Sequence, residues 1–373
     1  MLDNKSILVT GGTGSFGQKF IRMVLERYTP KKIIVYSRDE MKQWNMANDL
    51  KDHPKKHLVR FFLGDVRDKD RLHRAFSGID YVIHAAALKI VPAAEYNPFE
   101  FIKTNINGAM NIIDCAIDQK VKRVIALSTD KACNPVNLYG ATKLCSDKLF
   151  VAGNSYSSAT STRFAVVRYG NVMGSRGSVI PLFWSMRHSG ELPITDSKMT
   201  RFMITLEMGV EMVLHALKDS VGGEIYVRKI PSMHVMDVAR TIAPDANLKI
   251  VGIRPGEKLH EQMISPEDAQ TAYEYDNHFK ILPSIHEWHL DPKRIGNGVK
   301  CKPGFCYSSD TNVDWMSQAH LRSWLGKEYG KENVAGPAIA FPTGTGDWSP
   351  TVEPAEPELT ASSAKRSQPD FEI

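Results

Sequence analysis

Long apolar runs are missing from this chain of 373 residues. No stretch is long enough to cross a bilayer, and the first residues lack the apolar segment of a secretory signal. The composition therefore disfavours a membrane protein and predicts a cytoplasmic protein with no membrane partner.

Cysteines are few and do not pair in the sequence. There are five of them, an odd number, and no two have Cys-x-x-Cys spacing. This argues against a disulfide framework and against a cysteine zinc site. We expect a reduced protein that binds no metal.

Strong charge of one sign is also absent. The formal net charge is +5, and the basic residues are scattered along the chain. Such a balance disfavours a nucleic-acid partner but suits a small anionic substrate. Hydrophobic residues make up 42% and charged residues 24%, which is typical of a globular protein with a substantial core.

What the sequence does contain is a glycine triplet directly after its first apolar run. Residues 7–9 predict a buried strand, residues 20–25 have helical periodicity, and Gly11, Gly14 and Gly17 lie between them. Glycines at this spacing allow a tight turn and close approach to a pyrophosphate at a helix N-terminus. The alternative is a glycine-rich connection without a ligand. The residues expected at the dinucleotide are Gly11, Thr13, Gly14, Ser15, Phe16 and Gly17.

The second predicted strand ends in a basic group. An acidic residue at this position would bind the ribose 2′-hydroxyl of NAD, but here Arg38 comes first, with Ser37 before it and Lys42 one helical turn later. A guanidinium, a hydroxyl and an ammonium suit a 2′-phosphate, so NADP is favoured over NAD. In the alternative, Arg38 is solvated and Asp39 holds the ribose of NAD. Glu40 completes this group of cofactor candidates.

The ends of the next two predicted strands supply further cofactor contacts. Asp65 could hold the adenine amino group while Val66 packs on the ring. Lys89 is expected to point into the cleft between cofactor and substrate. Small residues before it let the backbone lie against the cofactor: Ala85, Ala86 and Ala87.

The richest stretch follows a buried strand predicted over residues 123–127. It places Ser128-Thr129-Asp130-Lys131 at the carboxyl end of that strand, where open α/β sheets bind their ligands. A helix opening near Leu138 carries Tyr139 and Lys143 on one face. The Lys143 ammonium can favour the Tyr139 phenolate, and a tyrosine that exchanges a proton beside a nicotinamide suits alcohol oxidation. Tyr-x-x-x-Lys is also a common coincidence, and the glycine triplet is what raises its weight.

Alternation of strands and helices predicts an α/β protein with a Rossmann-like, doubly wound parallel sheet and a smaller, interleaved C-terminal substrate lobe. We expect an NADP-binding domain over 1–171 with a returning segment at 205–230. The substrate-binding lobe is expected over 172–204 and 231–325, and a disordered tail over 326–373.

Two arginines of the lobe are candidates for a diphosphate. Arg176 and Arg254 each lie in a glycine-containing loop, and guanidinium groups bind phosphate oxygens bidentately. The alternative for each arginine is a surface salt bridge.

Together these motifs resemble the extended short-chain dehydrogenase/reductase family. Within it they are similar to the inverting UDP-N-acetylglucosamine 4,6-dehydratases of the pseudaminic acid pathway, from about residue 1 to residue 325. Six segments carry the resemblance: Gly-Gly-Thr-Gly-Ser-Phe-Gly at 11–17, Tyr-Ser-Arg-Asp-Glu at 36–40, His-Ala-Ala-Ala-Leu-Lys at 84–89, Ser-Thr-Asp-Lys-Ala at 128–132, Gly-Asn-Val-Met-Gly-Ser-Arg-Gly-Ser at 170–178 and Arg-Pro-Gly-Glu-Lys-Leu-His-Glu at 254–261.

The resemblance implies a lyase that converts UDP-N-acetylglucosamine to UDP-2-acetamido-2,6-dideoxy-β-L-arabino-hex-4-ulose. The steps would be C4 oxidation, C5 deprotonation with water loss, and hydride return to C6. Tyr139 would take the C4 hydroxyl proton, Lys143 would lower the pKa of Tyr139 and hold the nicotinamide ribose, and Thr129 would bind the C4 oxygen. Asp130 would protonate the leaving hydroxyl, and Lys131 would be the C5 base where retaining relatives have an Asp-Glu pair.

A base must be neutral, so we expect the cationic nicotinamide or Lys143 to depress the pKa of Lys131. The alternative is that Lys131 is only an ion-pair partner of Asp130.

The resemblance also implies substrate contacts and a homo-oligomer, such as a hexamer. Val172 would join the cofactor site. The expected substrate contacts are Lys89, Thr104, Asn171, Arg176, Val179, Thr195 and Arg254.

Two other functions stay open. An NADP-dependent nucleotide-sugar 4-epimerase or reductase would have no use for the Asp130-Lys131 pair as acid and C5 base. A non-catalytic NADP-sensing protein would not need Tyr139 and Lys143. Fold alone does not choose between them.

Overall fold

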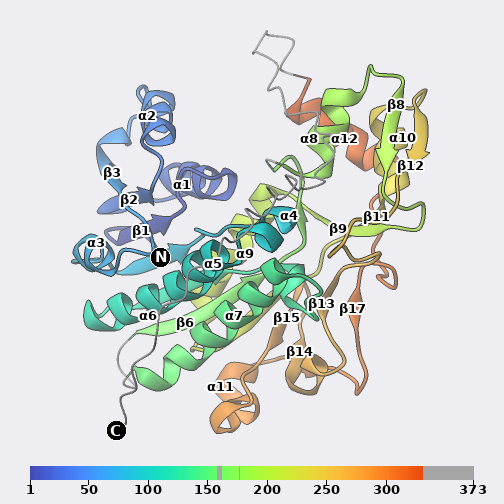
Figure 1. Ribbon diagram of the computed structural model, residues 1–373. Helices are drawn as coiled ribbons and strands as arrows, with labels where there is room; N and C mark the ends of the chain where they lie inside the picture. Colours follow the sequence, from blue (N-terminus) through green and yellow to red (C-terminus); the bar gives the residue numbers. More distant parts are fainter. Residues whose placement is uncertain (158–161, 176, 331–373) are drawn as a thin grey trace, which may run out of the picture. The chain divides into compact units, whose positions relative to one another are not determined.

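The computed structural model describes residues 1–157, 162–175 and 177–330. The chain divides into two units, of which Met1–Leu325 is the compact unit described below (Figure 1). Residues 331–373, most of the predicted tail, lie outside the described residues, as does Arg176.

One sheet organises the compact unit. Its strand order is β16-β14-β15-β10-β6-β5-β4-β1-β2-β3, and the run from β10 to β3 is parallel. The order reverses between β1 and β4, the position where open sheets of this kind form a ligand crevice. This confirms the predicted α/β, Rossmann-like class. The parallel strands are β1 (Ser6–Thr10), β2 (Lys32–Ser37), β3 (Val59–Leu63), β4 (Tyr81–His84), β5 (Arg123–Leu127), β6 (Arg163–Arg168) and β10 (Ile225–Arg228).

An antiparallel extension of the sheet was not foreseen. It consists of β15 (His278–Ile281), β14 (Ala272–Glu274) and β16 (Val299–Lys300). Antiparallel neighbours need no helical crossover, so they lack the strand–helix–strand spacing by which the parallel strands are recognised. These residues come from the stretch that we assigned to the substrate lobe, whose boundaries stay a prediction.

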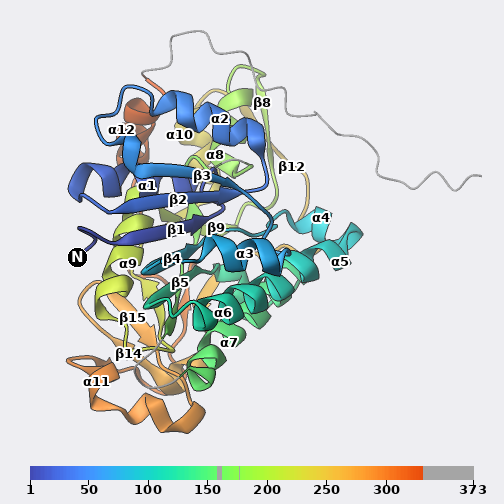
Figure 2. The same cartoon turned by 90° about the vertical axis from the view of Figure 1, so that its left-hand side faces the viewer.

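Helices cover both faces of the sheet (Figure 2). α1 (Ser15–Arg27) and α9 (Leu206–Asp219) pack together on one face, whereas α3 (Lys69–Ala75), α6 (Gly108–Asp118) and α7 (Leu138–Tyr156) pack on the other. α2 (Glu40–Asp49) contacts β2. Among the described residues no helix combines the length and apolar character that a bilayer span needs.

The sequence predicts one long helix over residues 97–115, but in the structure this helix is interrupted. It begins as α5 (Pro98–Phe101), continues as a π-helical stretch over Ile102–Asn107, and becomes α6 only at Gly108. π-helical turns are often found at functional sites, because they turn side chains out of the regular register. Here the stretch buries Thr104 and Asn105.

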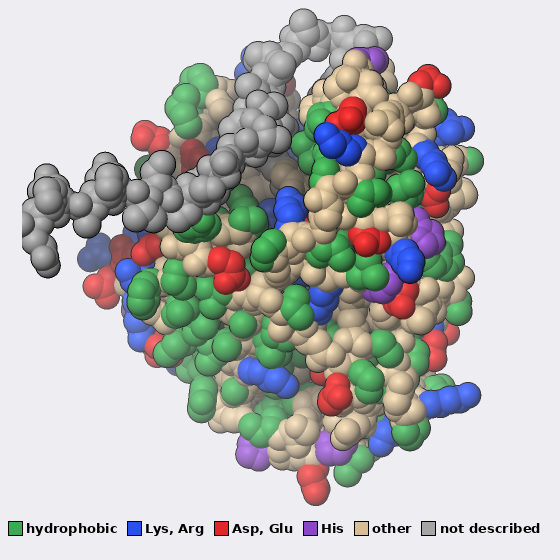
Figure 3. All heavy atoms as spheres, turned by 45° about the vertical axis from the view of Figure 1, so that its right-hand side comes forward, with side chains coloured by type: hydrophobic (Ala, Val, Ile, Leu, Met, Phe, Trp, Pro, Cys, Tyr) green, Lys and Arg blue, Asp and Glu red, His purple; other side chains and the backbone are tan. Residues whose placement is uncertain are grey.

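The surface is mixed in character. On the face drawn in Figure 3, hydrophobic side chains form patches, and charged side chains of both signs lie scattered between them. Exposed large apolar residues include Ile90, Tyr96 and Phe99, in and around α5 and α4 (Val91–Tyr96).

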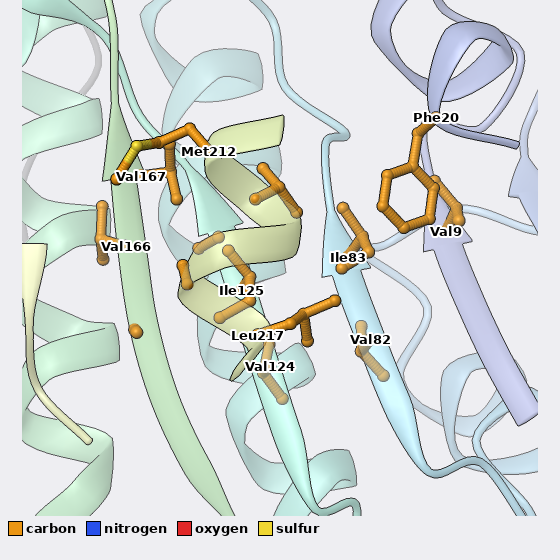
Figure 4. Packing of buried hydrophobic residues seen from close by; sticks show 14 of the residues in the cluster. Val9, Phe20, Val82, Ile83, Val124, Ile125, Val166, Val167, Met212 and Leu217 are labelled. Atoms are coloured by element: carbon orange, nitrogen blue, oxygen red, sulfur yellow. The ribbon is translucent and has the colours of Figure 1, made fainter. Parts of the chain in front are cut away.

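The core lies between the central strands and α9 (Figure 4). Val9, Ile83, Ile125 and Val167 of successive strands are fully buried on one face, and Leu217 of α9 packs among them. Each such side chain contributes about 1.5–3 kcal/mol by leaving water. The packed core fixes the carboxyl ends of β1, β4 and β5 relative to one another.

Smaller sheets and helices follow β6. The sequence predicts a last helix over residues 315–325, but in the structure Trp315 forms a β-bridge with Ser232 and the helix begins at Gln318. The elements are β7 (Asn171–Val172), β9 (Thr200–Ile204) and β11 (Ser232–His234) in one sheet, β8 (Glu191–Ile194) with β12 (Asn247–Ile250), β13 (Gln262–Ile264) with β17 (Tyr307–Ser308), and helices α8 (Val179–Met186), α10 (Val235–Ile242), α11 (Pro292–Ile295) and α12 (Gln318–Glu328).

Candidate active site

The glycine turn after β1 forms a tight cradle. Gly11 has φ +65°, and a Cβ there would lie 2.8 Å from the Ala85 oxygen and the Ala86 nitrogen. A Cβ on Gly17 would lie 2.5 Å from the Gly12 Cα. α1 then starts with no acidic side chain in its first turn, so its free N–H groups favour an anion. The cradle therefore fits a dinucleotide pyrophosphate.

The other residues of this turn lie at the same place. Gly14 caps α1, and its N–H donates to the Gly11 oxygen at 2.9 Å. Thr13 is buried, Ser15 is the first residue of α1, and the Phe16 ring stacks on Tyr169 at 6.4 Å between centroids. The turn therefore packs against Tyr169, the residue directly after β6.

After β2, the Arg38 guanidinium follows the strand directly, and the next side chain, the Asp39 carboxylate, is already hydrogen-bonded to α2. Asp39 caps α2 by accepting from the Lys42 N–H at 2.9 Å, and its Oδ2 lies 2.7 Å from Lys42 Nζ. Arg38 is half-exposed, with Nη1 3.5 Å from Asp65 Oδ2. Ser37 is buried beside them. This arrangement disfavours the alternative in which Asp39 binds the ribose, because its carboxylate already serves α2. Glu40 is exposed at the start of that helix.

After β3, the Asp65 carboxylate pairs with the nearby Arg67 side chain. Burial acts to raise the pKa of Asp65, but hydrogen bonds from Arg67, one of them 2.9 Å from Nε, outweigh it and lower the pKa. Val66 is buried, and Tyr36 donates from its hydroxyl to the Asp65 carbonyl at 2.9 Å.

Lys131 lies between two buried carboxylates. Its Nζ is 3.1 Å from Asp130 Oδ1 and 3.0 Å from Glu261 Oε1, and both acids are only 1% exposed. Thr129 donates to Asp130 Oδ1 at 2.9 Å. Burial alone would lower the pKa of Lys131, but the two carboxylates outweigh it and raise the pKa. The expected depression by Lys143 is therefore wrong: the protein's own groups hold Lys131 as an ammonium.

Tyr139 and Lys143 are both buried on α7, but they do not act on each other as expected. Burial raises the pKa of Tyr139 to about 12, and the groups that oppose this are the Lys131 charge and the Thr129 hydroxyl. Lys143 instead donates from Nζ to the Leu127 carbonyl at 2.8 Å. Its ammonium is directed at the carboxyl end of β5. The charge that lowers the pKa of Tyr139 is therefore that of Lys131, not that of Lys143 as expected.

Sequence reasoning missed a buried charge network behind Lys143. Asp147 accepts from Ser128 Oγ at 2.7 Å and from Arg168 at 3.3 Å, and Arg168 donates to Asp268 at 3.0 Å. Burial lowers the pKa of Lys143, and Asp147 opposes this. The signal was present, since Asp147 follows Lys143 by the same four residues that separate Lys143 from Tyr139.

Four buried polar atoms near the candidate residues have no hydrogen-bond partner among the described residues. Buried polar atoms are normally bonded, so such atoms indicate a place for a ligand. They are Thr104 Oγ1, Asp130 Oδ2, Asn171 Oδ1 and Glu261 Oε2.

The remaining substrate candidates are placed unevenly. Lys89 lies near enough to Lys131 that burial and then the Lys131 charge lower its pKa. Arg254 shows the surface alternative: it is 65% exposed and pairs with Glu257 at 2.5 Å. Val179 begins α8 and Thr195 follows β8. Of the remaining cofactor candidates, Ala87 lies in the loop after β4, and Val172 lies in β7.

Comparisons with known proteins agree with this arrangement. Residues 7–283 match the family model described as polysaccharide biosynthesis protein. Two Campylobacter jejuni proteins named UDP-N-acetylglucosamine 4,6-dehydratase (inverting) are 54% and 55% identical, over 86% of this chain and 97% of each relative. A UDP-glucose 4-epimerase of Rickettsia canadensis is 41% identical over 75% of this chain and 84% of its own. Among solved structures, Pen from Bacillus thuringiensis matches with TM-score 0.79 and 36% identity, over 88% of this chain and 98% of that one.

Proposed function

The chain belongs to the polysaccharide biosynthesis protein family, and from this premise we propose that it is an NADP-dependent UDP-N-acetylglucosamine 4,6-dehydratase that inverts C5. The predicted resemblance to the inverting dehydratases is confirmed by relatives of that name at 54% and 55% identity. The product would be UDP-2-acetamido-2,6-dideoxy-β-L-arabino-hex-4-ulose, formed by a hydro-lyase as the first step of pseudaminic acid biosynthesis.

One observation carries the proposal: an acid and a base lie together beside the tyrosine. Oxidation at C4 needs only Tyr139 and its neighbours, but loss of water from C5 and C6 needs two more proton-transfer groups. Asp130 and Lys131 supply them, 3.1 Å apart at the end of β5. The unpartnered Asp130 Oδ2 supports a ligand oxygen at this carboxyl group.

The cradle fits NADP. The glycine turn and the α1 N-terminus would hold the pyrophosphate, while Ser37, Arg38 and Lys42 would hold the 2′-phosphate. When bound, NADP would accept a hydride from the sugar and return it. The support for NADP over NAD is the capping role of Asp39, which directs its carboxylate at α2.

The protein's own groups would then move the protons. Tyr139 would take the C4 hydroxyl proton, and Thr129 would bind the C4 oxygen. The pKa of Tyr139, raised to about 12 by burial although the Lys131 charge already opposes this, has to fall for this step. Asp130 would protonate the C6 hydroxyl while Lys131 removes the C5 proton. Lys143 would hold the nicotinamide ribose, with Asp147 keeping its charge.

A 4-epimerase is the second candidate, because a relative of that name is 41% identical. Proton NMR of a reaction with UDP-N-acetylglucosamine in deuterium oxide separates the two. We expect a 4-keto-6-deoxy sugar with L-arabino coupling constants and deuterium at C5. A product epimerised at C4 that retains its C6 hydroxyl would overturn the dehydratase. A D-xylo 4-ketone at the earliest times would overturn the inversion alone.

We also infer a cytoplasmic homo-oligomer, for which a hexamer is one form. The odd number of cysteines supports a reducing compartment. Ile90, Tyr96 and Phe99 are 64–73% exposed, and exposed apolar groups of this size are typical of subunit contacts. Light scattering after gel filtration tests this, and a monomer at working concentration would contradict it.

A further inference from the structure

One buried carboxylate beside the proposed base has no part in the steps above. Glu261 is 1% exposed, its Oε1 lies 3.0 Å from Lys131 Nζ, and its Oε2 has no partner among the described residues. Burying a charge is costly unless it is paired, and the partners of this carboxylate are Lys131 and, with Nε 3.9 Å from Oε1, Arg201.

The backbone holds Glu261 in place from both sides. Its N–H donates to Ser309 Oγ at 2.9 Å, and the Ser309 N–H donates to the Glu261 carbonyl at 2.8 Å. Ser309 Oγ also lies 2.7 Å from Thr200 Oγ1 of β9. Segments distant in sequence therefore fix the backbone of Glu261 where β5 delivers Lys131.

We propose that Glu261 is a positioning residue that holds Lys131 Nζ toward C5 of the sugar and stabilises the ammonium that forms when Lys131 takes the C5 proton. The inference rests on the proposed dehydratase function. It adds a third member to the Asp130-Lys131 pair, one that never exchanges a proton with the substrate.

The proton count explains why a third group is useful. Moving one proton from Lys131 Nζ to Asp130 Oδ1, across 3.1 Å, gives a neutral amine and a carboxylic acid together. The amine then takes the C5 proton, and the C5–H electron pair forms the C5–C6 double bond. The C6–O bond breaks as Asp130 gives its proton to the hydroxyl, which leaves as water. The pair thus returns to ammonium and carboxylate, and the Glu261 charge favours this state over the neutral amine that removes the C5 proton.

The charges around Lys131 predict how its titration depends on Glu261. The groups that face it are Asp130 beside it, Glu261 before β13, Arg201 on β9, Lys89 after β4 and Tyr139 on α7. Asp130 and Glu261 raise the pKa of Lys131, and Arg201 opposes them. Removing the Glu261 charge should therefore lower the pKa of Lys131.

The test compares kcat and KM of Glu261→Gln and wild type over a range of pH. The pair works only while it holds one proton, so kcat falls as the pH rises through the pKa of Lys131, and this descending limb should shift to lower pH in the variant. The plateau should fall about 10- to 100-fold, less than the ~10²–10⁴ that a whole general base contributes, with KM nearly unchanged. Glu267→Gln is the matched control: the same substitution in an exposed side chain of the same segment, expected to behave as wild type.

Glu261→Asp keeps the charge and shortens the reach. It should retain the wild-type position of the limb with a lower plateau, and it serves as the second variant if Glu261→Gln does not fold. An unshifted limb in Glu261→Gln, or a limb displaced equally in Glu261→Asp, would overturn the inference. Absence of dehydrated product from wild type would instead overturn the proposed function itself, so the two failures are distinguishable.

Discussion

Replacing Lys131 with alanine should leave nucleotide binding intact and stop water loss. The cradle that would bind NADP lies at β1 and α1, and Lys131 takes no part in it. Loss of a general base costs about 10²–10⁴ in rate, which is about 3–5 kcal/mol of transition-state free energy at ~1.4 kcal/mol per tenfold.

The same substitution should also lower the free energy of unfolding. It leaves Asp130 and Glu261, each 1% exposed, without the ammonium between them. Removing one partner of a buried ion pair costs about 3–5 kcal/mol. Because the Lys131 side chain is 24% exposed, we expect the lower end, about 3 kcal/mol.

The assay combines product NMR, NADP titration and denaturant unfolding, with Lys122→Ala as the matched control. Lys122 precedes β5 at its opposite end and pairs with Asp80 at 2.8 Å, but its side chain is 58% exposed. Surface pairs contribute about 0–1 kcal/mol, so this variant should stay near wild type in all three measurements. Normal product formation by Lys131→Ala would refute the base role. A stability loss no larger than that of Lys122→Ala would refute the buried-pair argument.

Three further predictions concern the cofactor, the pH dependence and the tail. Arg38→Ala should weaken NADP binding about tenfold and leave NAD binding nearly unchanged. A charge-assisted hydrogen bond contributes about 1.5–3 kcal/mol, and we expect the lower end because Arg38 is half-exposed. An equal loss of affinity for both cofactors in fluorescence titrations would contradict this. Burial lowers the pKa of His84 to about 3, against ~6.5 in the unfolded chain, which therefore binds the proton first. The unfolding free energy of the wild type should then fall by about 2 kcal/mol between pH 7 and pH 5 relative to that of His84→Gln. Parallel curves of unfolding free energy against pH for the two proteins would refute this. Ending the chain at Leu325, the end of the compact unit, should leave dehydration unchanged, and lost activity would show that the removed part contributes.

Local patterns were enough to predict the parallel sheet and the strand ends that carry the candidate site. The glycine turn between β1 and α1 was readable because each glycine answers a local steric demand, such as the 2.8 Å approach of Ala85 to Gly11. Asp130, Lys131 and Tyr139 could be predicted to lie together, because the end of one strand and the start of the next helix carry all three.

The partners of those residues were not readable, because they come from distant segments. Glu261 meets Lys131 across 130 positions of sequence, and the pairing of β13 with β17 together with the Ser309 contacts brings it there. The direction of Lys143 depends on the Leu127 carbonyl, a contact that helical spacing does not describe. The π-helical turn at Thr104 likewise follows from packing rather than from apolar periodicity.

Glu261 also bears on why a lysine can stand where, by family resemblance, retaining dehydratases carry a glutamate. An acidic pair with one proton on its aspartate has a charge of −1, and it faces a cationic nicotinamide. Exchanging the glutamate for a lysine alone would remove that negative charge. Here Asp130, Lys131 and Glu261, all charged, again sum to −1, because the missing carboxylate is supplied from the 254–261 segment. On these three groups alone, the negative charge facing the proposed cofactor would be kept, while the proposed base would gain a longer, more flexible side chain. What the exchange changes is the reach of the group at C5, which is where the inverting and retaining reactions differ.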